Sequence, residues 1–165
     1  MALELSRRLA AGGIPGTLVS LDAWLVSVEE RKPGSMVLER YECDRIVEAI
    51  RRILEGEEVR PPAYDPVTRR RTAQAGGPPI RVKSGVLLVE GVVALAIASL
   101  KALSVLSVHI AVPDTLRLAR LRAFYREVKG VPEQETETII AARELEEVAL
   151  IQRAGAAADA ILELV

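Results

Sequence analysis

The stretch GVLLVEG, residues 85–91, is the part of the sequence that most constrains the fold. Its run GVLLV is continuously apolar, which is typical of a strand buried on both faces of a parallel sheet. The strand ends at Glu90 and so delivers a carboxylate to its carboxyl end. Open parallel α/β sheets bind their ligands at that end of the strands, which makes Glu90 a candidate functional residue.

A second apolar run, TLVSL at residues 17–21, follows Pro15 and Gly16 and leads into Asp22. Its apolar and β-branched residues predict another short buried strand. In a parallel sheet Asp22 and Glu90 would then face the same crevice. Carboxylates there can accept a hydroxyl proton or bind Mg²⁺ through oxygen. Each carboxylate taken alone also fits a role as the cap of the following helix, and this alternative stays open.

The rest of the sequence alternates helical and strand patterns. Residues 59–82 are rich in proline and glycine, which indicates an irregular excursion or a short hairpin. Strands alternating with helices predict a mostly parallel α/β sheet flanked by helices, in a single domain over residues 1–165. Helices are expected at 2–11, 44–55, 94–102, 114–128 and 133–155, and further strands at 104–112 and 160–165.

The composition excludes several classes of protein. The formal net charge of the 165 residues is −1, so no overall positive field favours nucleic acid or an anionic membrane. No apolar run reaches the ~20 residues of a membrane helix, and the N-terminal residues lack the pattern of a signal peptide. The single cysteine excludes an intramolecular disulfide and fits a reducing compartment, so a cytoplasmic protein is expected.

Five segments together resemble the uridine kinase and phosphoribulokinase family of P-loop kinases. They occur in the family's order and span nearly the whole chain. They are VSLDAWL at 19–25, ILEGEEVRPPAYDPVTRRR at 53–71, LLVEG at 87–91, HIAVPDTLRLARLRAFYRE at 109–127 and AADAILEL at 157–164.

The resemblance implies a P-loop NTPase-like, three-layer fold and a function. The family transfers the γ-phosphoryl group of ATP, with Mg²⁺, to a hydroxyl group of a nucleoside or small sugar-like acceptor. By position, Asp22 matches the catalytic base and Glu90 the Walker B carboxylate near Mg²⁺. Trp24 and Tyr64 match the acceptor pocket, although core packing suits Trp24 equally well. Four arginines fall in the lid region, about 114–130, where a solvated helix face is the alternative; they are Arg117, Arg120, Arg122 and Arg126.

The phosphate-binding loop of this family has no counterpart in the sequence. The motif G-x-x-x-x-G-K-[ST] cradles phosphates with its backbone N–H groups and lysine, and it does not occur in the 165 residues. The nearest sequence, GGIPGT at 12–17, has no lysine and follows a helix. By the resemblance, helix 2–11 matches the helix after the P-loop, and the first strand of the sheet is missing. Two interpretations remain: an N-terminally incomplete sequence, or a relative that has lost ATP binding.

The acceptor segment also departs from the nucleoside kinases. Pro66 and Arg69 stand where those kinases have an aromatic residue and a histidine. Arginine prefers an anionic partner, which favours a phosphorylated or carboxylated acceptor; a solvated loop at 69–71 is the alternative. The expected partners are therefore a small-molecule acceptor and a nucleotide, and a homo-oligomer is left open. The competing function is a non-catalytic relative that binds a phosphorylated metabolite or a partner.

Overall fold

The computed structural model describes residues 2–72 and 76–164. The Cα positions group into two compact units, Met1–Leu103 and Ser104–Val165. Each unit contains one pair of parallel strands with helices beside it. None of the helices in the described ranges is long and apolar enough to cross a membrane.

The first unit is built on the two strands that the sequence predicts. Strand β1 (Gly16–Ser20) pairs in parallel with β4 (Val86–Glu90). The Val86 N–H group donates to the Pro15 carbonyl at 2.8 Å. Gly85 permits this close approach, because it has a φ of +93° and a Cβ there would lie 2.1 Å from the Pro15 oxygen.

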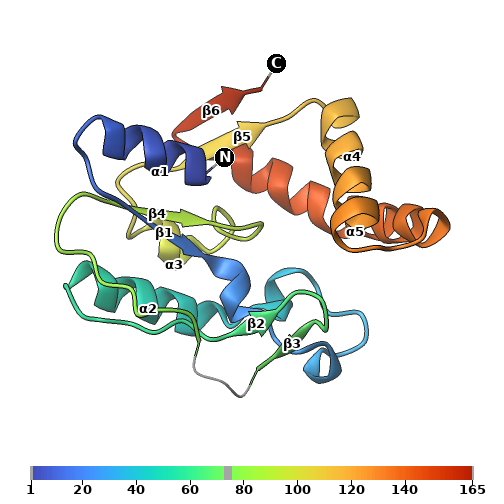
Figure 1. Cartoon of the computed structure of the whole chain (residues 1–165), viewed down its shortest axis with the longest axis horizontal. Helices are drawn as coiled ribbons and strands as arrows, with labels where there is room; N and C mark the ends of the chain where they lie inside the picture. Colours follow the sequence, from blue (N-terminus) through green and yellow to red (C-terminus); the bar gives the residue numbers. More distant parts are fainter. Residues whose placement is uncertain (1, 73–75, 165) are drawn as a thin grey trace. The chain divides into compact units, whose positions relative to one another are not determined.

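Helices α1 (Ala2–Ala11) and α2 (Cys43–Leu54) lie on opposite sides of this strand pair (Figure 1). Helix α2 carries the core, because its apolar residues at helical spacing are buried, and the short α3 (Ala98–Lys101) packs against it. The buried residues of α2 are Ile46, Val47, Ala49, Ile50 and Ile53. Gly56 follows the C-cap residue Glu55 at a φ of +84°, a conformation that glycine adopts readily after a helix end.

Helix α2 begins one residue before the predicted start at 44. The helix begins at Cys43, after Glu42, so Asp44 lies inside its first turn rather than before it. A carboxylate in the first turn still interacts favourably with the N-terminal end of the helix dipole.

Three short 3₁₀ turns and one hairpin connect these elements. The turns are η1 (Leu21–Trp24), η2 (Val28–Glu30) and η3 (Leu38–Arg40). The hairpin pairs β2 (Tyr64–Asp65) with β3 (Arg70–Arg71), which confirms the short hairpin predicted within residues 59–82. The Asp65 carboxylate closes its turn by accepting bonds from the Val67 N–H group and the Thr68 hydroxyl at 2.8 and 2.6 Å.

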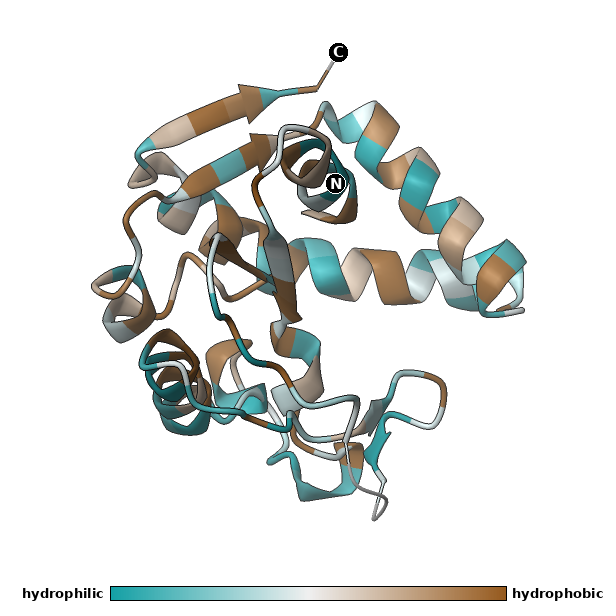
Figure 2. Ribbon diagram, turned by 60° about the vertical axis from the view of Figure 1, so that its left-hand side comes forward, coloured by the Kyte–Doolittle hydropathy of each residue, from teal (hydrophilic) through white to brown (hydrophobic). Residues whose placement is uncertain are grey.

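The second unit pairs β5 (Val108–Ala111) in parallel with β6 (Ala160–Glu163). Both strands are largely hydrophobic (Figure 2). Between them the chain forms α4 (Asp114–Ala123), one π-helical turn η4 (Phe124–Val128) and α5 (Glu133–Ala156). Strand β5 begins later than predicted, because the N–H and hydroxyl groups of Ser107 bond to the Asp159 carboxylate instead of joining the strand ladder.

The predicted α/β class with parallel strands and flanking helices is confirmed. In the described residues the parallel strands form two separate pairs, β1–β4 and β5–β6, rather than one continuous sheet. Each unit therefore contains one parallel strand pair of its own.

Candidate functional site

Asp22 and Glu90 lie at the same end of one parallel strand pair. Ser20, the last residue of β1, stands opposite Glu90 in the register, and Asp22 follows in the turn η1. Gly91 brings the end of β4 against this turn, because a Cβ there would lie 3.0 Å from the Leu21 Cβ. Asp22 is exposed and Glu90 half-buried, so both carboxylates are open to solvent. The structure thus brings them to one edge, while their chemical roles stay predictions.

Tyr41 is a site residue that the sequence analysis missed. Its hydroxyl donates a hydrogen bond to Oδ1 of Asp22 at 3.1 Å. An antiparallel bridge between Tyr41 and Leu25 holds the two segments together. Tyr41 lies 19 residues beyond Asp22, at a spacing that matches no helix or strand period, so only the tertiary structure could reveal the pair.

Arg31 is the second residue that the sequence analysis passed over. Its Nη2 donates to the Tyr64 hydroxyl at 2.9 Å, and its Nε donates to the Val26 carbonyl at 2.9 Å. The side chain is half-buried, and within the described ranges it forms no ion pair with a carboxylate. Its positive charge is therefore fixed in place and uncompensated beside the predicted acceptor tyrosine.

The three arginines at 69–71 have different surroundings. Arg70 forms an exposed ion pair with Glu29, and Arg71 turns inward toward Glu42. Arg69 is exposed at a φ of 60°, unusual for a residue other than glycine, and its carbonyl accepts the Val28 N–H group at 3.0 Å. Among the residues that the structure describes, the Arg69 side chain has no hydrogen bond or ion pair. Its guanidinium is therefore free to bind a ligand, and its acceptor role stays a prediction.

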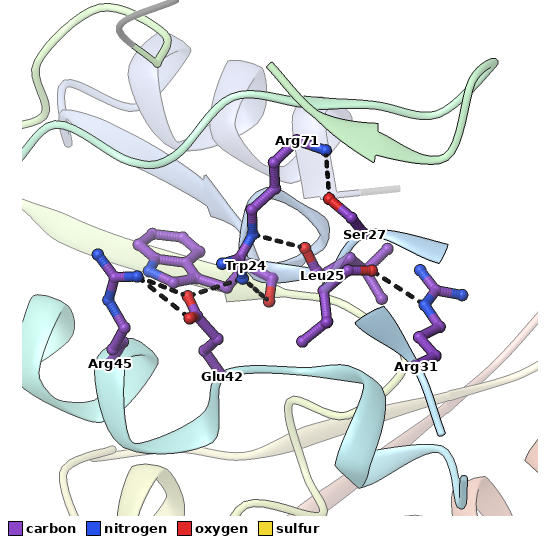
Figure 3. A network of polar contacts seen from close by, with 8 residues as sticks. Trp24, Leu25, Ser27, Arg31, Glu42, Arg45 and Arg71 are labelled. Carbon is purple, nitrogen blue, oxygen red and sulfur yellow. Dashed lines mark hydrogen bonds and ion pairs between the residues drawn. The ribbon is translucent and has the colours of Figure 1, made fainter. Parts of the chain in front are cut away.

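Arg71 joins the hairpin to the turn that carries Asp22 (Figure 3). Its guanidinium donates to the carbonyls of Leu25 and Trp24 at 3.0 and 3.3 Å. The same group pairs with the Glu42 carboxylate at 2.7 Å, and Glu42 also accepts bonds from Arg45. Burial alone would raise the pKa of Glu42, but the hydrogen bonds from Arg71 and Arg45 outweigh it and hold that pKa below its ordinary value.

Trp24 lies in the interior of the first unit. Its side chain is only 2% exposed, which favours core packing over a wall of the acceptor pocket. Contact with a substrate therefore stays a prediction for Trp24.

The predicted lid arginines of α4 and η4 are mostly bound to carboxylates. Arg117 pairs with Asp114 at 3.0 Å and forms a two-pronged contact with Glu144 of α5. Arg122 binds Glu137 at 2.7 and 2.9 Å, and Arg126 lies 3.6 Å from Glu133. Arg120 is exposed, and no interaction of its side chain occurs within the described ranges. These pairings support a role for Arg117 and Arg122 in joining α4 to α5, and the lid assignment stays a prediction.

Solved structures with a similar chain path include two proteins assigned as kinases. A protein assigned as a fructose transport system kinase from Silicibacter sp. TM1040 matches with a TM-score of 0.75 at 20% identity, over 97% of this chain and 81% of that chain. A protein assigned as a uridine kinase from Bacillus stearothermophilus matches with a TM-score of 0.60 at 16% identity, over 98% and 79%. The YGR205w protein matches with a TM-score of 0.62 at 13% identity, over 99% and 79%. No family model and no curated protein sequence matches the chain.

The chain has the fold of the uridine kinase group. The resemblance predicted from five sequence segments is thereby confirmed for the fold. At identities of 20% and below, the likeness concerns the chain path, so the reaction and the substrate rest on the residues themselves.

The residues of this chain fit Mg²⁺ and ATP to different degrees. No group of three or more histidine, cysteine, aspartate or glutamate residues within 2–72 and 76–164 could hold a metal ion. Mg²⁺ beside a nucleotide needs only one or two carboxylates plus phosphate oxygens, and the half-buried Glu90 suits that role. The phosphates of ATP need a cradle of backbone N–H groups and a lysine, and the sequence has no such motif. These residues therefore do not by themselves fit ATP.

Proposed function

We propose that this chain forms the acceptor side of a kinase-type phosphotransferase that phosphorylates a hydroxyl group of a nucleoside or small sugar-like molecule. The observation that carries the proposal is the placement of Asp22. Tyr41 fixes its carboxylate at the carboxyl end of the β1–β4 pair, and Glu90 lies at the same strand end.

Asp22 acts in this proposal as the general base. Its Oδ1 accepts the Tyr41 hydroxyl, which leaves Oδ2 to accept the proton of the acceptor hydroxyl. Orientation matters more than basicity here, because phosphoryl transfer is catalysed mainly by positioning and by charge stabilisation. Glu90 is the carboxylate for Mg²⁺. In a longer chain that contains a P-loop segment, ATP would supply the phosphoryl group, and Mg²⁺ beside Glu90 would supply neutralising charge.

The surroundings of Tyr64 support an anionic acceptor. Arg31 donates to the Tyr64 hydroxyl and lacks a carboxylate partner among the described residues. Arg69, on the same hairpin as Tyr64, is exposed and likewise unpaired in the described ranges. Arginine binds phosphate and carboxylate groups through bidentate hydrogen bonds. These residues therefore suit a sugar phosphate or a hydroxy acid better than a neutral nucleoside.

A transfer assay tests the proposal. The 165-residue chain and any longer product of the same reading frame are incubated with radiolabelled ATP and a panel of nucleosides, sugar phosphates and hydroxy acids. The proposal expects acceptor-dependent transfer by any chain that contains a Gly-rich segment ending in Gly-Lys-Ser or Gly-Lys-Thr. The Asp22→Asn variant of the same chain should lose this transfer. A product with that segment and no transfer to any acceptor contradicts it.

The second candidate is a non-catalytic protein that binds a phosphorylated metabolite. The absence of the P-loop motif from the sequence favours it. Calorimetry separates the two candidates: this one expects sugar phosphates to bind in the absence of ATP, and ATP neither to bind nor to be consumed. For either candidate we propose a cytoplasmic location, as the single cysteine suggests.

A further inference from the structure

We infer that Arg71 and Glu42 act as a positioning clamp that holds the hairpin bearing Tyr64 against the turn bearing Asp22. Among the described residues, neither side chain forms a hydrogen bond or ion pair with Asp22 or Tyr64. The inference rests on the proposed function only in assigning Asp22 and Tyr64 to the acceptor site.

The clamp begins directly opposite Tyr64. Arg71 is the register partner of Tyr64 in the β2–β3 hairpin. Its backbone N–H group donates to the hydroxyl of the buried Ser27 at 2.9 Å. Its side chain then reaches the carbonyls of Trp24 and Leu25, which close the turn that begins at Leu21. One residue thus connects the Tyr64 strand to the turn containing Asp22.

Glu42 completes the clamp from a third segment. Its backbone N–H group donates to the Trp24 carbonyl at 3.1 Å, and its carboxylate pairs with the guanidinium of Arg71. Glu42 directly follows Tyr41, whose hydroxyl holds Asp22. The Trp24 carbonyl therefore receives bonds from both members of the pair, which links the segments of Asp22, Tyr41 and Tyr64. Figure 3 shows the Arg71 guanidinium between the Trp24 carbonyl and the Glu42 carboxylate.

The clamp requires the planar guanidinium group of arginine, which carries several N–H donors in a fixed geometry. Arg71 bonds to two carbonyls and one carboxylate from a side chain that is 22% exposed. The neighbouring Arg70 is 61% exposed and, among the described residues, pairs only with Glu29. A lysine at position 71 would retain a charge opposite Glu42 but lose the fixed fork that reaches several acceptors. Arg70 therefore offers a matched control on the same hairpin.

The sole tryptophan, Trp24, reports directly on the clamp. The test compares Arg71→Gln, Arg71→Lys, Glu42→Gln and the control Arg70→Gln with the wild type. The measurements are Trp24 fluorescence, acrylamide quenching and amide hydrogen exchange. Arg71→Gln and Glu42→Gln should shift Trp24 emission to the red. They should also speed exchange in peptides 24–28 and 64–71 about tenfold or more, with little change in the core of α2. Arg71→Lys should regain the urea midpoint but keep the Trp24 shift, and Arg70→Gln should match the wild type.

Several outcomes would overturn the clamp. These are unchanged emission and exchange in Arg71→Gln, an equal effect of Arg70→Gln, or full rescue of the Trp24 signal by lysine. If Arg71→Gln does not fold, Arg71→Lys decides, because it retains the cation opposite Glu42. None of the readouts uses ATP or an acceptor, so failure of the clamp and failure of the proposed function are distinguishable.

Discussion

The Tyr41 hydroxyl donates a hydrogen bond to Oδ1 of Asp22 at 3.1 Å. This contact orients the carboxylate of the proposed base and leaves its second oxygen for an acceptor hydroxyl.

Asp22→Asn and Tyr41→Phe should distinguish loss of the proposed base from loss of the hydrogen bond that orients it. In a longer chain that catalyses transfer, Asp22→Asn should lower kcat by about 10²–10⁴-fold. ATP affinity should be retained, because a general base acts on the acceptor hydroxyl and not on the nucleotide. Tyr41→Phe loses one hydrogen bond and should lower kcat by about three- to tenfold. The measurement is steady-state kinetics at fixed pH, and an unchanged kcat in Asp22→Asn would remove this residue from the mechanism.

The 165-residue chain should not consume ATP at the rate of an ordinary kinase. It contains no P-loop motif to hold the β- and γ-phosphates. A coupled assay for ADP, with and without acceptors, checks this expectation. Turnover on the order of 1–100 s⁻¹ would contradict it.

Substitution of Arg31 or Arg69 should affect charged acceptors selectively. Arg31→Gln and Arg69→Ala each remove a cation near Tyr64, so kcat/KM for an anionic acceptor should fall by about ten- to hundredfold, and for a neutral nucleoside much less. Arg70→Gln is the matched control, since its guanidinium is occupied by Glu29. If uridine or cytidine is the best acceptor and both variants behave as wild type, the two arginines are ordinary loop residues.

The Arg117–Glu144 pair should make the second unit sensitive to acid. The hydrogen bond from Arg117 outweighs burial and holds the pKa of Glu144 below its ordinary value. A lowered folded pKa adds stability at neutral pH, and that stability is lost as the pH falls through the folded pKa, below about 4.5. Because the side chains are 27% and 35% exposed, the pair should contribute about 1 kcal/mol or less.

A double-mutant cycle in urea checks this expectation. Arg117→Gln, Glu144→Gln and the double variant should show a smaller coupling energy at pH 3 than at pH 7. A coupling of equal size at both pH values would show that the carboxylate charge is not its source.

Gly155→Ala should destabilise the second unit. A Cβ at this buried position would lie 2.6 Å from the His109 ring, so the ring or the helix α5 would have to shift. Overpacking of this kind costs about 1–3 kcal/mol. The measurement is the urea midpoint by circular dichroism, with Gly12→Ala as the control, because its Cβ would meet only ordinary contacts from 3.4 Å. His109→Ala in the Gly155→Ala background should recover part of the loss, and equal effects of the two glycine substitutions would contradict the packing argument.

Most helices and strands could be predicted from local patterns. The apolar spacing from Ile46 to Ile53 and the run Val86–Glu90 are signals that lie within one element, and both elements formed where expected. The boundaries were less accurate. Strand β5 is shorter than its apolar run, because Asp159, 52 residues away, takes the hydrogen bonds of Ser107.

The candidate site was only partly predictable. Asp22 and Glu90 could be placed together, because parallel pairing alone brings the ends of their strands to one edge. Tyr41 and Arg31 could not, because their partners lie 19 and 33 residues away in irregular segments without a period.

The sequence by itself determined the α/β class and the strand ends that carry the two carboxylates, because local patterns in contiguous residues indicate both. It also showed that the 165 residues contain no P-loop motif. The tertiary structure decided which arginine of the run 69–71 turns inward. The sequence makes the three equivalent, but the hairpin register points Arg71 toward the carbonyls of Trp24 and Leu25 and leaves Arg69 free for a ligand. The reason is physical: the partners of a side chain depend on where other segments end in space, and long-range hydrogen bonds leave no periodic mark on the sequence.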